Sequence, residues 1–257
     1  MNRVFEVPKT PKRIISLVPS QTELLVDLGL EKFIIGVTKF CIHPSYLRKK
    51  KTIVGGTKNI KIDKIKALKP DIILCNKEEN TKEIVEACEQ IAPTHVSDIF
   101  TLDDSKELIM QYGEILSCKT AAENIVKKLN IEISKFQQFI KNTKEKKVAY
   151  FIWRNPWMVA GNNTFINHLL ELNNFKNIYS NKQRYPEINL DEITKNDALD
   201  FILLSSEPYP FKEKHISEIS KYYKNSQTIL VDGEMFSWYG SRLLKAFDYF
   251  IQLHRSI

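Results

Sequence analysis

The segment NIKIDKIKALKPDIIL at positions 59–74 and the segment EINLDEITKNDALDFILL at positions 187–204 share one pattern. In each, two apolar residues separated by one position precede an aspartate, Asp63 or Asp191, and a short amphipathic stretch follows. Each segment then ends on an acidic residue followed by three or four apolar residues. Two copies this far apart argue against a solenoid of adjacent repeats and favour a duplicated domain. We therefore expect two similar lobes.

Short apolar runs alternate with helical patterns in the first part of the chain. Three such pairs are RIISLV with TELLVDLGL, DIILC with ENTKEIVEACEQI, and THVSDI with SKELIMQYGEIL. This alternation is typical of parallel strands with crossover helices. Between the first strand and its helix, Ser20 and Glu23 have the S-x-x-E spacing of a capping box, which predicts a helix that starts just after Pro19.

The middle of the chain has no glycine or proline between Gly113 and Pro156. Apolar residues recur there at three- and four-residue intervals, and lysine and glutamate fill the opposite face. We predict one helix from about Lys119 to Lys141, which would be roughly 35 Å long at the rise of an α-helix. A helix of this length is enough to cross a whole domain.

Strand and helix patterns resume after the predicted long helix. KKVAYFIW, DFILLSS and QTILVDG read as strands, and TFINHLLELN and a final segment from about Tyr239 to His254 read as helices. The predicted fold class is α/β, with two Rossmann-like lobes over residues 1–118 and 143–257, joined by a single linker helix over residues 119–142. Open α/β sheets bind ligands at the carboxyl ends of their strands, so we expect a ligand cleft between the lobes.

The composition is that of an ordinary globular protein. The 257 residues are 43% hydrophobic and 27% charged, and 38 Lys and Arg against 31 Asp and Glu give a formal charge of +7. The lysines are scattered rather than arranged along one face, which indicates a solvated surface and argues against a nucleic-acid partner.

The cysteines and the N-terminus bear on the compartment. None of the cysteines has CxxC spacing, so we expect buried free thiols rather than disulfides. The N-terminal residues lack the apolar stretch of a secretory signal, and no apolar run is long enough to span a bilayer. Taken alone, these patterns predict a soluble and untargeted protein, unless a leader was removed. The cysteines are Cys41, Cys75, Cys88 and Cys118.

The order of the motifs resembles the substrate-binding proteins of ABC importers for cobalamin and ferric siderophores, the helical-backbone class of periplasmic binding proteins. The resemblance covers nearly the whole chain. It is carried by RIISLVPSQTELLVDLGL, IIGVTKF, KIDKIKALKPDIIL, the single linker helix, GNNTFINHLLELNNFKNIY, RYPEINLDEI and FSWYGSRL. It implies a periplasmic or cell-surface location, with the cytoplasm as the alternative, and a membrane permease as partner. We expect a monomer.

The resemblance also implies a docking role for the repeated aspartates. In the family, an acidic residue on each lobe contacts arginines of the permease, and the repeat matches these positions to Asp63 and Asp191. Glu192 could substitute for its neighbour. The alternative is that both aspartates are helix N-caps, since Asp before an apolar-periodic run is a favoured cap.

The ligand implied by the resemblance is a cobalamin or other corrinoid, or a ferric siderophore, held on aromatic side chains. Large flat ligands need broad apolar contact with a few polar anchors. The positions that match or adjoin the family's contacts are Phe40, Trp157, Met158, Tyr185, Trp238, Tyr239 and Arg242.

Some of these aromatic and charged residues also have simpler interpretations. Trp153, inside the strand KKVAYFIW, is interpreted as a core residue and excluded from the site. Trp157 follows Pro156 in a predicted turn and is either exposed in the cleft or packed. Arg242 would anchor a phosphate or carboxylate of the ligand, or pair with Glu234.

An enzymatic function has little support in the sequence. Neither a G-x-G-x-x-G nor a P-loop nor a G-x-S-x-G motif is present, and the histidines are scattered without an i, i+4 pair. We therefore predict no catalytic residues, no bound metal and no intrinsic cofactor. The alternatives left open are a two-lobed metal chelatase and a cytoplasmic protein that binds or scavenges a corrinoid or another metal chelate.

Overall fold

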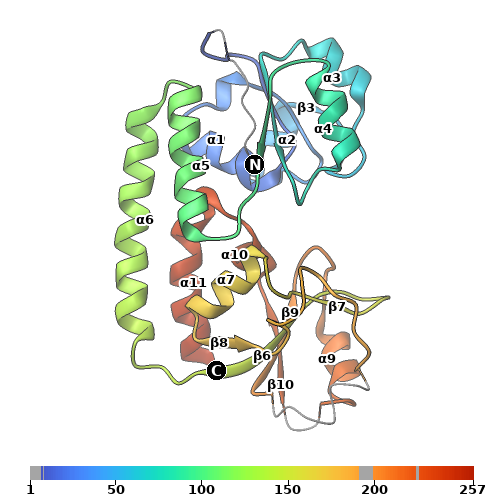
Figure 1. Ribbon diagram of the computed structural model, residues 1–257, viewed down its shortest axis with the longest axis vertical. Helices are drawn as coiled ribbons and strands as arrows, with labels where there is room; N and C mark the ends of the chain where they lie inside the picture. The colour runs from blue at the N-terminus through green and yellow to red at the C-terminus, as the bar shows by residue number, and fades with distance from the viewer. Residues whose placement is uncertain (1–6, 8, 191–198, 224–225) are drawn as a thin grey trace. The chain divides into compact units, whose positions relative to one another are not determined.

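The computed structural model describes residues 7, 9–190, 199–223 and 226–257 (Figure 1). Its contacts divide the chain into two compact units. The first comprises Met1–Ile131 and Trp238–Leu244, and the second comprises Glu132–Ser237 and Lys245–Ile257. The chain therefore passes from the first unit to the second inside the long central helix, and returns to the first for a short segment near its C-terminus. The division expected from the sequence places that segment in the second lobe instead.

The first unit contains a five-stranded parallel sheet with the order β3-β2-β1-β4-β5. The strand order reverses between β1 and β4, and this is the switch point at which open α/β sheets bind ligands. Every residue of β4 is buried, as expected for a parallel strand covered on both faces. The strands are β1 (Ile14–Ser16), β2 (Ile34–Val37), β3 (Thr52–Ile53), β4 (Ile72–Asn76) and β5 (Thr94–Ser97).

Helices follow the strands of the first sheet, as the sequence predicts. Threonines cap two of them: Thr81 Oγ1 accepts from the Ile84 amide at 3.4 Å, and Thr101 Oγ1 accepts from the Asp104 amide at 3.1 Å. These bonds satisfy amide groups that the first turn of a helix leaves without partners. The helices are α1 (Pro19–Asp27), η1 (Glu31–Phe33), α2 (Leu47–Lys50), α3 (Ile62–Leu68), α4 (Lys82–Glu89) and α5 (Leu102–Ile115).

The predicted capping box at the start of α1 is wrong. Val18 is the N-cap, without a side-chain cap bond, and Pro19 is the first helical residue. Ser20 and Glu23 are both buried inside the helix. Proline at the first position has no amide hydrogen to satisfy, so the helix starts well without a capping side chain.

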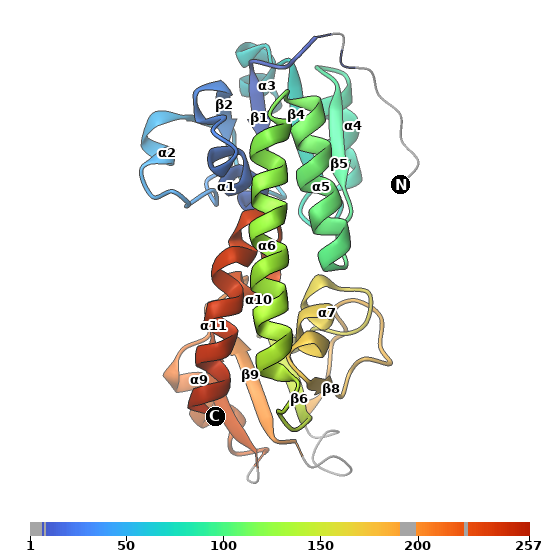
Figure 2. The same ribbon diagram turned by 90° about the vertical axis from the view of Figure 1, so that its left-hand side faces the viewer.

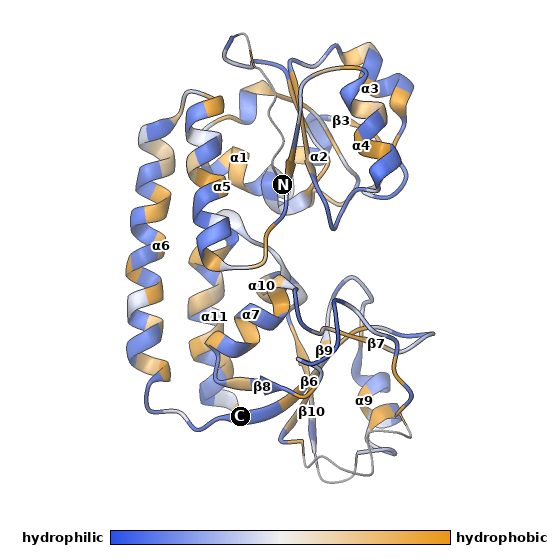
Figure 3. Ribbon diagram, viewed as in Figure 1, coloured by the Kyte–Doolittle hydropathy of each residue, from blue (hydrophilic) through white to orange (hydrophobic). Residues whose placement is uncertain are grey.

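The long helix α6 spans Lys119–Ile140, which confirms the prediction. Figure 2 shows α5 running beside its first half. The two helices approach closely at Gly113, because a Cβ atom there would lie 2.7 Å from the Cβ of Ala122. Apolar residues recur along α6 among hydrophilic ones (Figure 3). The buried positions are three, four or seven residues apart, which places them on one face of the helix: Ala122, Ile125, Leu129, Phe136 and Ile140.

The second unit contains a sheet with the order β10-β9-β6-β7, in which β8 also pairs with β6. The pairs of β6 with β8 and β9, and of β9 with β10, are parallel, whereas β7 is antiparallel to β6. Strand β6 coincides with the predicted KKVAYFIW. The strands are β6 (Lys146–Trp153), β7 (Met158–Val159), β8 (Phe175–Asn177), β9 (Phe201–Ser205) and β10 (Gln227–Val231).

Aromatic packing joins the last helix to the second half of α6. The ring of Phe136 lies 5.5 Å from that of Phe247 and 5.9 Å from that of Phe250. The 3₁₀ turn η2 (Gly240–Arg242) precedes this helix and belongs to the first unit. Among its described residues, the second unit contains the second half of α6, the helices α7 (Phe165–Leu172), α9 (Glu213–Ile219) and α10 (Gly233–Ser237), and most of α11 (Leu243–Ser256).

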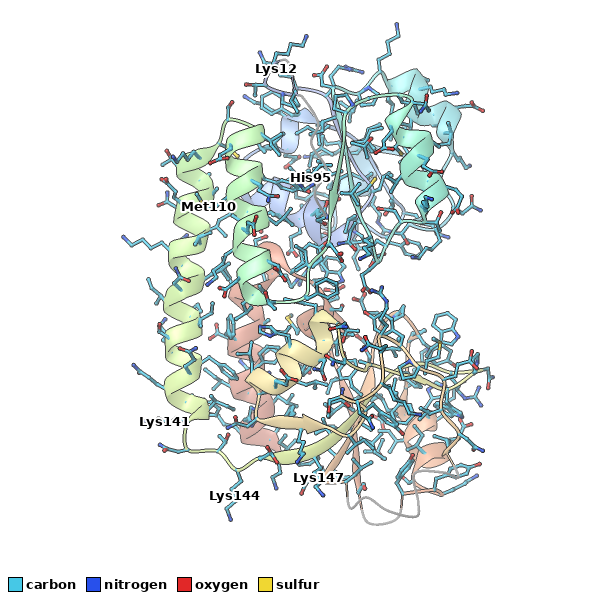
Figure 4. The ribbon with its side chains drawn as sticks, viewed as in Figure 1. Lys12, His95, Met110, Lys141, Lys144 and Lys147 are labelled. Atoms are coloured by element: carbon cyan, nitrogen blue, oxygen red, sulfur yellow. The ribbon has the colours of Figure 1, made fainter. Side chains whose placement is uncertain are left out.

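The cysteines agree with the sequence interpretation. Each cysteine is a free thiol, and three are buried, whereas Cys118 is partly exposed. Three lysines after α6 are exposed: Lys141, Lys144 and Lys147, which are labelled in Figure 4. Across the part of the chain that the structure describes, no helix is both long and apolar enough to cross a membrane.

Candidate ligand-binding site

A buried hydrogen-bond network fills the carboxyl edge of the first sheet. Its centre is Gln21, in the first turn of α1. The amide nitrogen of Gln21 lies 2.7 Å from Ser97 Oγ and 2.9 Å from the Tyr239 hydroxyl, and its amide oxygen accepts from the Tyr112 hydroxyl at 2.7 Å. Burial raises the pKa of both tyrosines, which keeps the phenols neutral. The network therefore joins β5, α1, α5 and the returning segment Trp238–Leu244.

The returning segment is fixed by a buried ion pair. Arg242 Nε donates to Glu23 Oε2 at 2.8 Å, and both side chains are about 5% exposed. The guanidinium carbon of Arg242 lies 5.0 Å from the ring centre of Trp238, and the His43 ring meets Trp238 edge-on at 5.4 Å. Gly240 donates its amide to Ser105 Oγ at 2.9 Å.

These contacts bear on three residues that the sequence assigns to the ligand. Trp238, Tyr239 and Arg242 are 7%, 6% and 4% exposed. The Arg242 guanidinium lies on Glu23, where the sequence suggested Glu234 as the alternative partner. Their contact with a ligand stays a prediction. The ion pair with Glu23 gives Arg242 a structural role, because it anchors the returning segment.

Phe40 presents an exposed aromatic ring after β2. It is 48% exposed, and the Lys39 ammonium lies 4.9 Å from its ring centre. The turn that follows β3 approaches this ring, since a Cβ atom on Gly56 would lie 3.2 Å from the Phe40 ring. The neighbouring Gly55 has φ +128° and room for no side chain, because a Cβ would meet Asn59 O at 2.5 Å. The Phe40 ring is therefore accessible to a ligand.

An acidic residue lies near the same edge, after β4. Burial raises the pKa of Glu79, which the charge of Lys58 and a hydrogen bond with Thr57 oppose. Asn76, which ends β4, holds the turn by accepting from the Glu78 amide at 2.8 Å and the Glu79 amide at 3.2 Å. The edge therefore carries a carboxyl group that its surroundings disfavour as an anion.

Aromatic rings, rather than a polar network, gather at the carboxyl edge of the second sheet. Trp157 stacks on Phe211 with ring centres 6.1 Å apart and an interplanar angle of 8°, and it meets Phe151 edge-on at 5.7 Å. The guanidinium carbon of Arg154 lies 5.7 Å from the Trp157 ring centre. Trp157 is partly buried, so it is packed against the core and still has an accessible surface.

The interpretation of Trp153 as a core residue is wrong. This residue ends β6 and is 39% exposed. The sequence pattern predicted burial because the five residues before it are apolar, and those five are indeed buried. The strand passes beyond the edge of the core at its last residue, and a single-sequence pattern does not mark that point.

Met158 and Tyr185 lie on two segments that the structure brings together. Met158 forms a β-bridge with Glu187, and the Ile188 amide donates to Trp157 O at 2.9 Å. The segment that contains Tyr185 therefore runs antiparallel to β7. Both predicted ligand residues are partly buried.

The proposed docking residues can be assessed for only one copy of the repeat. Asp63 is the second residue of α3 and is exposed, whereas Lys61 is the N-cap. The N-cap alternative is therefore wrong for Asp63, whose charge is free to interact favourably with the helix N-terminus or with a partner. Asp191 and Glu192 lie outside the described residues.

Several residues of these edges had no motif in the sequence. Gln21, Glu79, Trp153 and Tyr209 each lie at the end of a strand or shortly after one, so the rule that ligands bind at carboxyl strand ends would have indicated them. In the part of the chain with described side chains, no three His, Cys, Asp or Glu residues gather as a metal site.

Two α/β units with mainly parallel sheets, and a long helix that passes from one unit into the other, are the architecture of a two-lobed binding protein of the helical-backbone class. Residues 14–226 match the family described as periplasmic binding protein, and the chain belongs to that family.

Individual relatives are distant. An uncharacterized ABC transporter substrate-binding lipoprotein of Bacillus subtilis is 26% identical over 204 residues, which cover 76% of this chain and 64% of that protein, less than two thirds of its length. A vitamin B12-binding protein of Pectobacterium carotovorum is 25% identical over 240 residues, covering 92% and 86%. A possible iron-binding, periplasmic solute-binding protein of Staphylococcus epidermidis has a similar fold, with a TM-score of 0.79, 22% identity and coverage of 95% and 98%.

Proposed function

We propose that this chain is the substrate-binding component of an ABC importer, and that it binds a chelated cofactor, a corrinoid or a ferric siderophore, outside the cytoplasm. Family membership supports a binding role, and the relatives named above include an ABC transporter lipoprotein and a vitamin B12-binding protein. The observation that carries the ligand class is the presence of accessible aromatic rings after strands of both sheets, on Phe40 and Trp157. Such rings give broad apolar contact with little entropy to lose.

The ligand class is tested by titration. Cyanocobalamin, haem and a panel of ferric hydroxamates and catecholates are added to the purified protein, and intrinsic tryptophan fluorescence is followed. We expect cyanocobalamin or one of the ferric chelates to bind with a Kd in the micromolar range or below. If neither the corrinoid nor any ferric chelate binds, whether or not haem does, the proposed ligand class is wrong.

We further propose that Asp63 and Asp191 contact the permease. Asp63 is exposed at the start of a short helix, so its carboxylate is available for a basic partner. Charged pairs at such an interface govern orientation and association rate more than affinity. Replacing both aspartates by Asn should leave folding and ligand affinity intact but abolish uptake.

The docking test needs a strain that depends on this protein for uptake of its ligand. A matched control replaces Asp27, an acidic residue at the end of α1, by Asn, and should leave uptake unchanged. Normal transport by the Asp63→Asn, Asp191→Asn protein would rule out the docking role.

A further inference from the structure

Trp153 occupies the place in the second sheet where a ligand contact is expected. It is the last residue of β6, which lies between β9 and β7 in the sheet. The pairing of β6 with β7 shifts register between Phe151 and Trp153, so strand alternation does not assign the face of Trp153. Its ring contact with Tyr209 places it beside the loop after β9, at the carboxyl end of the strand, where it is 39% exposed.

The exposed ring is the end of a continuous row of aromatic side chains. Trp153 meets Tyr209 edge-on with ring centres 5.7 Å apart, Tyr209 meets Phe211 at 4.8 Å, and Phe211 stacks on Trp157. The row joins the loop after β9 to the hairpin of β6 and β7. The Tyr209 amide strengthens this junction, because it donates to Ile152 O at 3.2 Å.

Tyr209 is held in one orientation by His215. The Lys212 amide donates to His215 Nδ1 at 2.8 Å, so Nδ1 carries no hydrogen and the proton of the neutral ring lies on Nε2. Nε2 lies 3.2 Å from the Tyr209 hydroxyl and therefore donates to it. The phenol ring is fixed at its hydroxyl end by this bond and is also in an edge contact with the Phe211 ring.

The turn directly after Trp153 is also fixed. Arg154 makes two hydrogen bonds with Glu218, from Nε at 2.9 Å and from Nη2 at 2.8 Å. This two-point pairing ties the residue next to Trp153 to helix α9, and planar arginine–carboxylate pairs of this kind restrict geometry strongly. Trp153 thus lies between two restraints, the Tyr209 ring on its side and the Arg154–Glu218 pair at the next residue. A side chain that is ordered before the ligand arrives loses less entropy on binding.

We propose that Trp153 and Tyr209 together form a ligand contact of the second unit, for a chelate that presents a flat apolar or conjugated surface. This inference rests on the proposed function and adds to it a contact that no motif in the sequence assigns. The exposed part of the Trp153 ring meets the ligand, and Tyr209 supports that ring from the side.

The first test compares two exposed aromatics of the second unit. Trp153 and Tyr222 are both 39% exposed, so Trp153→Ala is matched by Tyr222→Ala. The panel member that binds the wild-type protein is titrated by calorimetry. We expect Trp153→Ala to weaken binding roughly tenfold or more, Trp153→Phe to retain most of the affinity, and Tyr222→Ala to change nothing.

A second measurement does not depend on the Ala variant being folded. The chain has three tryptophans, so the protein labelled with fluorotryptophan gives three fluorine resonances, and Trp153→Phe identifies the one from Trp153. This resonance should shift when the chelate is added. The inference is overturned if the chelate binds the wild-type protein without shifting the Trp153 resonance and binds Trp153→Ala with unchanged affinity. The proposed function would then still stand. If nothing in the panel binds the wild-type protein, the proposed function fails as well.

Discussion

The carboxyl edges of the two sheets are built from different chemistry. In the first unit, Gln21 and its tyrosine and serine partners form a buried polar network under the returning segment Trp238–Leu244. In the second unit, Trp153, Tyr209 and their ring neighbours form an aromatic row that ends at the surface. Both sheets consist mainly of parallel strands, so the difference comes from the last residues of the strands, such as Ser97 and Trp153, and from the segments that follow them.

This difference in chemistry implies different roles: the first edge contributes mainly to stability, and the second mainly to ligand recognition. A buried polar network is costly to disturb, because a lost partner leaves another buried group without a hydrogen bond. Partly exposed rings contribute less to folding, because much of their surface still meets water. We therefore expect substitutions at the first edge to act mainly on stability, and substitutions of exposed rings to act mainly on ligand affinity.

The largest effect should come from the ion pair that anchors the returning segment. Replacing Arg242 by Ala removes one member of the buried ion pair with Glu23, and breaking a buried pair in this way typically costs about 3–5 kcal/mol. Urea denaturation followed by circular dichroism measures this loss. The control is Lys82→Ala, which removes a pair with Glu86 whose side chains are 83% and 58% exposed, and which should change the free energy of unfolding by less than about 1 kcal/mol.

An equal effect of the two variants would contradict the structural role of Arg242. The double variant Arg242→Met, Glu23→Leu sharpens the test, because apolar residues of similar volume leave no buried charge. It should recover most of the stability lost in Arg242→Ala.

The intermediate effect concerns Phe40, the exposed ring of the first unit. Its replacement by Ala should change the free energy of unfolding by less than about 0.5 kcal/mol, since the ring is already largely exposed. Ligand affinity should fall by about 1–3 kcal/mol if the ring is a central contact. Calorimetric titration and thermal melting of the same sample measure both quantities, and a variant that melts early but binds normally would reverse the interpretation of Phe40.

The smallest effect is a pH dependence of stability, to which the buried histidines and Glu79 contribute with opposite signs. Burial lowers the pKa of His95 in the first unit and of His215 and His254 in the second. The unfolded chain therefore takes up protons first as the pH falls below about 6.5, and the stability contributed by the neutral rings is lost. Glu79 acts the other way, because its raised pKa stabilises the fold at low pH and that contribution is lost as the pH rises.

Melting temperatures between pH 5 and pH 8 measure this balance. Glu79→Gln should raise the melting temperature at pH 7 relative to the wild type and lose this advantage at low pH. His215→Gln should flatten the decline below about pH 6.5. A melting temperature that rises steadily as the pH falls would show that the histidines do not behave as their burial implies.

The sequence predicted most of the fold because the fold depends on periodicity. The glycine-free stretch gave the bounds of α6 to within a residue, and the apolar runs located β4, β6 and β9. Periodicity reports burial along one element, and so it misjudged Trp153, where an apolar strand leaves the core. It also could not show that Glu23 pairs with Arg242, because that ion pair joins residues far apart in the chain.

Equilibrium dialysis with radiolabelled ligands tests the central claim most directly. The protein is dialysed against cobalt-labelled cyanocobalamin and against iron-labelled hydroxamate and catecholate chelates, with the bare cobalt and iron ions as controls. The account predicts that at least one intact chelate is retained at micromolar concentration and that the bare ions are not. Retention of a bare ion alone, or of no ligand at all, would contradict it.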